Sequence, residues 1–133
     1  MATENEILKD YKTVAVVGLS ANPMRPSNGV AGYLKSNGYR IIPVNPNEKV
    51  ILDETCYPDL TSIPEQVEVV DIFRKSEDVL PIVQEAVKIG ARAVWMQEGV
   101  INEEAAKYAA DAGLKVVMDK CMLKEHQKMQ SEK

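Results

Sequence analysis

Five short runs of apolar, mostly β-branched residues alternate with longer segments whose apolar residues recur every three or four positions. The runs lie at residues 13–17, 41–44, 67–73, 93–97 and 115–118. Runs of this kind are typical of strands buried on both faces of a parallel sheet. Helices are expected in the intervals between them, because the spacing of their apolar residues matches one helical face.

Three of the expected helices end in the same way. Each stops at a glycine, followed by one residue, a basic residue and a strand, as at Gly38, Gly90 and Gly113. Glycine is the usual left-handed residue at a helix end. The regular alternation predicts right-handed crossovers between parallel strands. We therefore expect one Rossmann-like three-layer α/β domain over residues 1–133, with a five-stranded parallel sheet and helices on both faces.

The two ends and one internal segment do not follow this alternation. Residues 1–12 are expected to lead into the sheet through a short helix at 3–10. Residues 50–65, which contain two prolines, are expected to be irregular. Residues 126–133 are polar, so we expect a frayed tail that leaves His126 solvated.

The composition of the chain argues against several classes of function. The chain is 45% apolar and 27% charged, with a net charge of −4, which argues against binding to nucleic acid or an anionic membrane. No apolar run approaches the roughly 18 residues of a membrane span. The two cysteines, Cys56 and Cys121, show no metal-site spacing, and reduced thiols in a cytoplasmic protein are the expectation. A protein partner or a homo-oligomer is left open.

The loop at residues 18–29 is the first candidate for chemistry. Gly18 follows the first expected strand and allows a sharp turn and the close approach of a ligand. Ser27 or Asn28 is expected to cap the next helix, whose free N–H groups suit a phosphate, and Arg25 adds positive charge. Strand-to-helix loops usually have roughly 2–6 residues, so this longer one is interpreted as an anion-binding loop rather than a plain connector.

Other polar loops are expected to meet this one. Parallel strands bring their carboxyl ends to one edge of a sheet, where ligands bind. The segments that follow the five strands are 18–27, 45–47, 73–75, 97–99 and 119–121. They are polar, partly basic and include Phe73, so they suit a phosphorylated ligand with a flat ring.

The usual dinucleotide motif is incomplete. Ser20 and Pro23 stand where its second and third glycines are expected, and no carboxylate follows the second strand at Val44 and Asn45. A Walker loop is also absent from the sequence. The basic residues near the edge favour a ligand rich in phosphate; they are Arg25, Lys49, Arg74 and Lys75.

Several motifs together resemble a known family. They are Val17-Gly18-Leu19-Ser20 with Asn22-Pro23 and Arg25-Pro26-Ser27, the segments 38–46 and 71–74, and Ala93-Val94-Trp95-Met96-Gln97-Glu98-Gly99. They are similar to the small CoA-binding proteins, which resemble the N-terminal CoA-binding domain of the succinyl-CoA synthetase alpha subunit. The resemblance covers nearly the whole chain. It implies a Rossmann-like fold that binds coenzyme A at the carboxyl edge of the sheet.

The resemblance also implies a division of the site. The pyrophosphate would lie on the loop that contains Gly18, Ser20, Asn22, Arg25, Pro26 and Ser27. The adenosine side would be lined by Val44, Asn45 and Pro46, with Lys49 near the 3′-phosphate and Phe73 and Arg74 flanking the adenine or ribose. The pantetheine arm would be bordered by Gln97, Glu98 and Gly99. Residues 119–121 correspond only loosely to the synthetase loop near the thiol end.

The sequence shows no triad, metal cluster or acid/base pair, which favours a non-catalytic coenzyme A or acyl-CoA binding protein. An enzyme or enzyme subunit acting on acyl-CoA, or an NAD-binding redox protein, are the alternatives. Cys121 could form a mixed disulfide with CoA, but the sequence favours a half-buried thiol without that role. Glu98 could act as a general base, but no partner nucleophile is visible. The sequence therefore favours a solvated or loop-bonding carboxylate.

Overall fold

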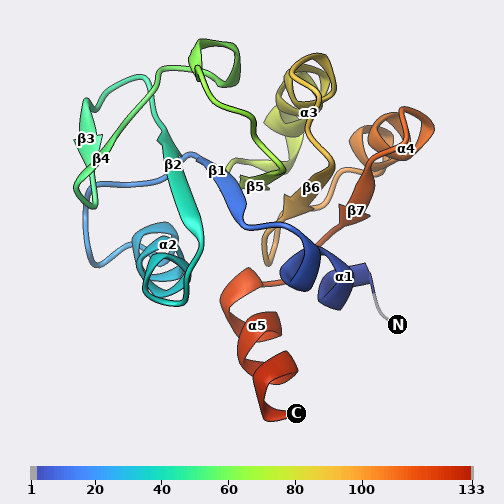
Figure 1. Cartoon of the computed structure of the whole chain (residues 1–133). Coiled ribbons are helices and arrows are strands. Elements are labelled where there is room, and N and C mark those ends of the chain that lie inside the picture. The colour runs from blue at the N-terminus through green and yellow to red at the C-terminus, as the bar shows by residue number, and fades with distance from the viewer. Residues whose placement is uncertain (1–2, 133) are drawn as a thin grey trace.

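The computed structural model describes residues 3–132 (Figure 1). The helices are α1 (Thr3–Asp10), α2 (Pro26–Ser36), α3 (Val79–Lys88), α4 (Glu103–Asp111) and α5 (Met122–Ser131). The strands are β1 (Thr13–Val17), β2 (Arg40–Val44), β3 (Val50–Ile51), β4 (Glu54–Thr55), β5 (Val69–Ile72), β6 (Ala93–Met96) and β7 (Lys115–Val117). Within residues 3–132, none of the helices has the length and apolar character needed to cross a membrane.

The main sheet has five parallel strands in the order β2-β1-β5-β6-β7. This confirms the predicted fold class. The strand order reverses between β1 and β5, which is the position where ligands bind in open α/β sheets. The last residues of three strands share one register, because Val17 of β1 pairs with Val44 of β2 and Ile72 of β5. The loops that follow these strands therefore begin at the same level.

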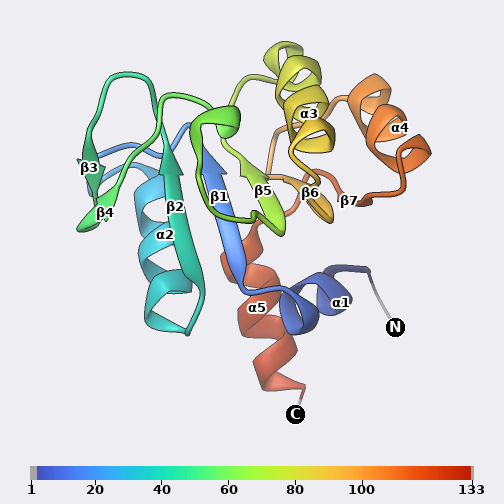
Figure 2. The same cartoon turned by 45° about the horizontal axis from the view of Figure 1, so that its top comes forward.

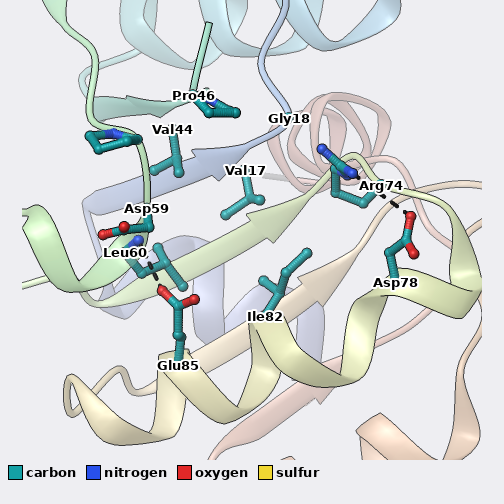
Figure 3. Close-up of a pocket in the computed structure, with 11 residues that line it drawn as sticks. Val17, Gly18, Val44, Pro46, Asp59, Leu60, Arg74, Asp78, Ile82 and Glu85 are labelled. Carbon is teal, nitrogen blue, oxygen red and sulfur yellow. Dashed lines mark hydrogen bonds and ion pairs between the residues drawn. The ribbon is translucent and has the colours of Figure 1, made fainter.

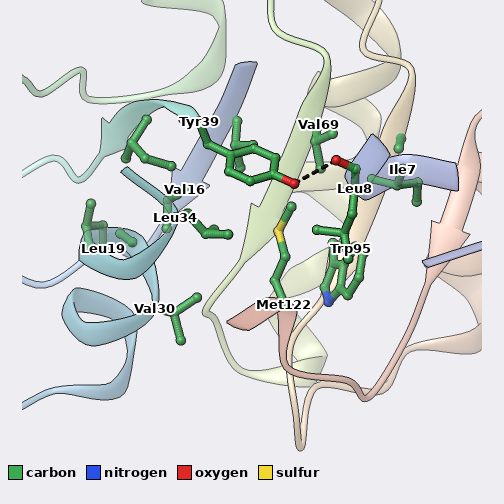
Figure 4. Packing of buried hydrophobic residues seen from close by; sticks show 14 of the residues in the cluster. Ile7, Leu8, Val16, Leu19, Val30, Leu34, Tyr39, Val69, Trp95 and Met122 are labelled. Atoms are coloured by element: carbon green, nitrogen blue, oxygen red, sulfur yellow. Dashed lines mark hydrogen bonds between the residues drawn. The ribbon is translucent and has the colours of Figure 1, made fainter. Parts of the chain in front are cut away.

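Helices cover both faces of the sheet. In Figures 1 and 2, α1, α2 and α5 lie on one face and α3 and α4 on the other. The first face packs around Trp95 and Met122, together with Leu34 of α2 and Ile7 and Leu8 of α1 (Figure 4). The Tyr39 hydroxyl donates a hydrogen bond of 2.6 Å to the Leu8 carbonyl. This hydrogen bond connects α1 to the segment that leads into β2, and burial raises the pKa of Tyr39 to about 12.

The segment expected to be irregular contains a small hairpin. Strands β3 and β4 pair antiparallel, and Leu52 and Asp53 between them have φ angles of 53° and 62°. Two consecutive positive φ angles match the primed turns that suit two-residue hairpins. The chain then forms a parallel bridge from Tyr57 to Val44 and a 3₁₀ turn at Leu60–Ser62. Two-residue strands leave no periodicity in the sequence, which explains why they were not predicted.

The expectation of a frayed tail is wrong. Helix α5 continues to Ser131, and the His126 side chain is only 3% exposed. Its Nδ1 atom lies 2.7 Å from the Tyr33 hydroxyl of α2. Met122 and His126 lie one helical turn apart and face the core, while most other residues of the helix are polar. Such a narrow buried stripe is hard to distinguish from a solvated tail by sequence.

Candidate functional site

Two adjoining pockets open at the carboxyl edge of the sheet. The larger has a volume of about 860 Å³ and lies among the β1–α2 loop, the ends of β2, β5 and β6, and the start of α5. The smaller has a volume of about 320 Å³ and lies toward α3. Both are lined by Gly18, Pro46, Arg74 and Asp78, so together they form one continuous cleft.

Most of the candidate residues line this cleft. Those in the larger pocket are Gly18, Ser20, Arg25, Pro26, Ser27, Asn45, Pro46, Phe73, Arg74, Gln97 and Glu98. Val44 lines the smaller pocket. Asn22, Lys49 and Gly99 line neither. The topology therefore brings together candidate residues from four of the five expected loops, and Cys121 of the fifth also lines the larger pocket.

The β1–α2 loop is held by its own hydrogen bonds. The Ser20 amide donates to Ser27 Oγ at 3.0 Å, and Asn28 Nδ2 donates to the Ser20 carbonyl at 2.9 Å. Neither side chain caps α2, contrary to expectation. The helix instead begins at Pro26 after Arg25, which has an extended backbone and makes no side-chain cap. Proline suits a first helical position because it has no N–H group to satisfy.

Asn22 has a role within the loop itself. Its Oδ1 atom accepts the Met24 amide at 2.9 Å, and its carbonyl accepts the Arg25 amide at 3.0 Å. These contacts form a turn of the kind that asparagine side chains stabilise. Asn22 therefore shapes the loop from outside the cleft lining.

Gly18 is required by the protein's own backbone. Its φ is +84°, and a Cβ atom at this position would lie 2.2 Å from the Phe73 carbonyl oxygen. The sequence suggested close approach of a ligand, but the structure shows that the β5–α3 loop already approaches this closely. Gly18 lets the loops after β1 and β5 meet at the point where the strand order reverses.

The end of β2 is fixed in a similar way. Asn45 Nδ2 donates to the Leu19 carbonyl at 3.0 Å, and Asn45 Oδ1 accepts the Asn47 amide at 2.8 Å. Asn45 therefore ties the β2 turn to the β1–α2 loop. Lys49 lies beyond this turn, where its carbonyl accepts the Cys56 amide at 2.8 Å and its side chain is exposed.

The charges around the larger pocket leave an excess of positive groups. Its lining includes Arg25, Arg74 and Lys75 against Asp78 and Glu98. Glu98 is already paired, because both of its oxygens lie 3.0 Å from Lys124 Nζ, and this pair raises the pKa of Lys124. Arg74 Nη2 lies 3.7 Å from Asp78 Oδ2. A locally basic pocket on a chain of net charge −4 suits an anionic ligand.

The smaller pocket has mainly apolar walls (Figure 3). Two of the apolar lining residues, Val44 and Pro46, were predicted as site residues. The others were not predicted; they are Val17, Pro58, Leu60 and Ile82. Glu85 of α3 accepts the Leu60 amide at 3.1 Å and closes one side. Pro58 and Leu60 reach the pocket through the Tyr57–Val44 bridge, a contact between distant segments that no local pattern reveals.

The far end of the larger pocket lies at β6 and α5. Gln97 and Val100 line it together with Cys121, which precedes α5. Gly99 does not line the pocket; its φ is 82°, and its amide donates to Asp119 Oδ1 at 2.7 Å. Asn47 and Lys75 also line the larger pocket; they belong to the loops expected at this edge but were not assigned a contact with the ligand. Asp78 lines it as well and was not expected there. Their positions shortly after strands, or directly before α3 in the case of Asp78, were the available signal.

The parallel sheet, the glycine turn after β1 and the cleft at the strand-order reversal define a Rossmann-like α/β domain. Within that class, the chain belongs to the family described as CoA binding domain, whose model matches residues 12–127.

Similar proteins agree with this assignment. The chain is 37% identical to Uncharacterized protein YneT of Bacillus subtilis over 91% of its own length and 90% of that protein. A solved structure of a hypothetical protein from Pyrococcus horikoshii OT3 superposes with a TM-score of 0.94 at 41% identity, covering 98% of this chain and 93% of that one. The chain is also 33% identical over 100 residues to an ADP-forming acetate–CoA ligase II of Archaeoglobus fulgidus. That match spans 74% of this chain and only 15% of the ligase.

Proposed function

We propose that this protein binds coenzyme A or an acyl-CoA along the cleft at the carboxyl edge of its sheet. The proposal rests on one observation, which is that a long, locally basic pocket adjoins a small apolar pocket. Coenzyme A has matching parts, namely a phosphate-rich centre, a flat base and an extended arm. Membership of the CoA binding domain family supports the same ligand.

The shape of the cleft suggests how the ligand would lie. The pyrophosphate would rest on the loop from Gly18 to Ser27, where Arg25 and Ser20 line the larger pocket. The adenine would enter the smaller pocket between Val44, Pro46 and Ile82. Arg74 borders both pockets, so we assign it to the ribose and 3′-phosphate in preference to Lys49. The pantetheine arm would follow Gln97 and Glu98 toward Cys121.

A non-catalytic role agrees best with the site. Glu98 is held by Lys124, and no nucleophile with an adjacent base lines the cleft among residues 3–132. The likeness to part of an acetate–CoA ligase supports one alternative. In that case the chain would supply the CoA site for a reaction completed by other domains or subunits.

Calorimetric titration tests this proposal, with NAD as the competing ligand. We expect one CoA to bind per chain and NAD to give no comparable heat. Arg74→Ala should weaken CoA binding by about 3–10-fold, because an exposed charge–phosphate contact is lost. Lys49→Ala is the matched control and should change the affinity less than about 2-fold. Absence of CoA binding by the parent protein would contradict the proposal.

A further inference from the structure

The sheet contains a buried carboxyl group that packing alone does not explain. Asp71 lies on β5, flanked in register by Val16 of β1 and Trp95 of β6, and its side chain is 0% exposed. Its Oδ2 atom has no hydrogen-bond partner, and it is the one such buried side-chain nitrogen or oxygen among the described residues. Burying a carboxyl in this way is costly, so its presence calls for a reason beyond stability.

The other oxygen of Asp71 contacts the cleft wall. Gln97 Nε2 donates to Asp71 Oδ1 at 2.6 Å, and Gln97 lines the larger pocket with only 3% of its surface exposed. Burial raises the pKa of Asp71 to about 7, so at pH 8 the group is mainly a carboxylate. A carboxylate only accepts hydrogen bonds, and it therefore selects the orientation in which the Gln97 nitrogen faces inward.

This orientation has a consequence for the cleft. The carbonyl oxygen Oε1 of the same amide must then face away from Asp71. It is not among the buried unpartnered atoms of residues 3–132, and Gln97 lines the larger pocket, which agrees with an Oε1 atom that faces the cleft. The wall at Gln97 thus presents an acceptor, which suits a ligand that carries N–H donors.

We propose that Asp71 is a positioning residue that fixes the Gln97 amide, so that its carbonyl oxygen accepts an amide N–H from the bound ligand. The inference rests on the proposed function, because the pantetheine arm of CoA carries two secondary amides that can donate. Asp71 does not touch the ligand. It acts through Gln97, which sets the hydrogen-bonding character of this part of the cleft.

A double-mutant cycle measured by calorimetry at pH 8 tests the inference. Gln97→Leu removes the acceptor, and Asp71→Leu removes the group that orients it; each should weaken CoA binding by about 2–10-fold. The double variant should bind no more weakly than Gln97→Leu alone. Asp71→Asn keeps a carbonyl that can accept the Gln97 amide, and it should bind CoA within about 2-fold of the parent.

A truncated ligand provides the control for folding. Adenosine 3′,5′-bisphosphate lacks the pantetheine arm, so it should bind the parent and all variants equally. The inference is overturned if Asp71→Leu weakens CoA binding as much in the Gln97→Leu background as in the parent, or if Gln97→Leu leaves CoA affinity unchanged. If the parent protein fails to bind CoA, the proposed function fails and the inference falls with it.

Discussion

Gly18 shows how a single residue sets the geometry of the site. Its positive φ and the nearby Phe73 carbonyl leave no room for a side chain. Any substitution would strain the backbone and separate the two loops that meet at the reversal of strand order. Glycine is therefore required at position 18 by the protein's own backbone, whether or not a ligand is bound.

Replacement of Gly18 should therefore lower stability as well as CoA affinity. Gly18→Ala should reduce the free energy of unfolding by about 2 kcal/mol or more, through left-handed strain and the contact with Phe73. Gly29 is the matched control, because it lies within α2 and a Cβ atom there meets nothing within 4 Å. Gly29→Ala should leave stability unchanged or raise it by up to about 1 kcal/mol in urea unfolding. Equal effects of the two substitutions would contradict this explanation.

Asp71 should make stability depend on pH. Its pKa is raised from 3.8 to about 7 by burial, so between these values the folded protein holds a proton that the unfolded chain releases. The contribution of Asp71 to the free energy of unfolding is therefore fully present below about pH 4. It is lost as the pH rises toward about 7, by about 1.4 kcal/mol per pH unit.

The difference between the parent and Asp71→Asn isolates this contribution. All other ionisable groups are common to the two proteins. Urea unfolding from pH 5 to pH 8 should show that the parent loses stability relative to the variant up to about pH 7, with no further change above it. Parallel pH profiles of the two proteins would exclude a buried, protonated Asp71.

At the scale of elements, the sequence predicted what local patterns determine. The β-branched runs gave all five strands of the main sheet, and glycine at residues 38, 90 and 113 marked where helices end, each with a positive φ. The positions of the cleft loops followed from parallel topology. The smaller pocket was not predicted, because its walls depend on the Tyr57–Val44 bridge between distant segments. Lys49 was expected near the 3′-phosphate from the family resemblance, but it lines neither pocket.

Helix α5 is the element whose role was most underestimated. It packs against α1 and α2, and Cys121 at its start lines the larger pocket. Lys120, just before it, forms an ion pair with Glu4 of α1 and lowers the pKa of that carboxyl. The helix therefore joins the N-terminal helix to the wall of the cleft.

Docking of α5 depends on Met122, which is 0% exposed. Met122→Ala should lower the free energy of unfolding by about 2–5 kcal/mol, because it removes a buried side chain and leaves a cavity. Met24 is the same residue type at 87% exposure, so Met24→Ala should change stability by less than about 0.5 kcal/mol. The pair can be compared directly by urea unfolding. A small effect of Met122→Ala would mean that α5 is not anchored through this residue.

At the scale of the whole molecule, the fold acts as a rigid frame for one cleft. Internal hydrogen bonds already fix the β1–α2 loop, the β2 turn and the Gln97 wall. A site organised before binding loses little conformational freedom when the ligand arrives. The backbone of the cleft should therefore change little between the free and bound states.

A crystal structure of the protein soaked or grown with CoA would locate the bound ligand directly. We predict CoA at the carboxyl edge, with its pyrophosphate against the Gly18–Ser27 loop, its adenine in the pocket beside Val44 and Ile82, and its arm along Gln97. Backbone positions around the cleft should shift by less than about 1 Å from the free protein. CoA bound at another surface, or an empty cleft at a saturating CoA concentration, would contradict the proposed binding site.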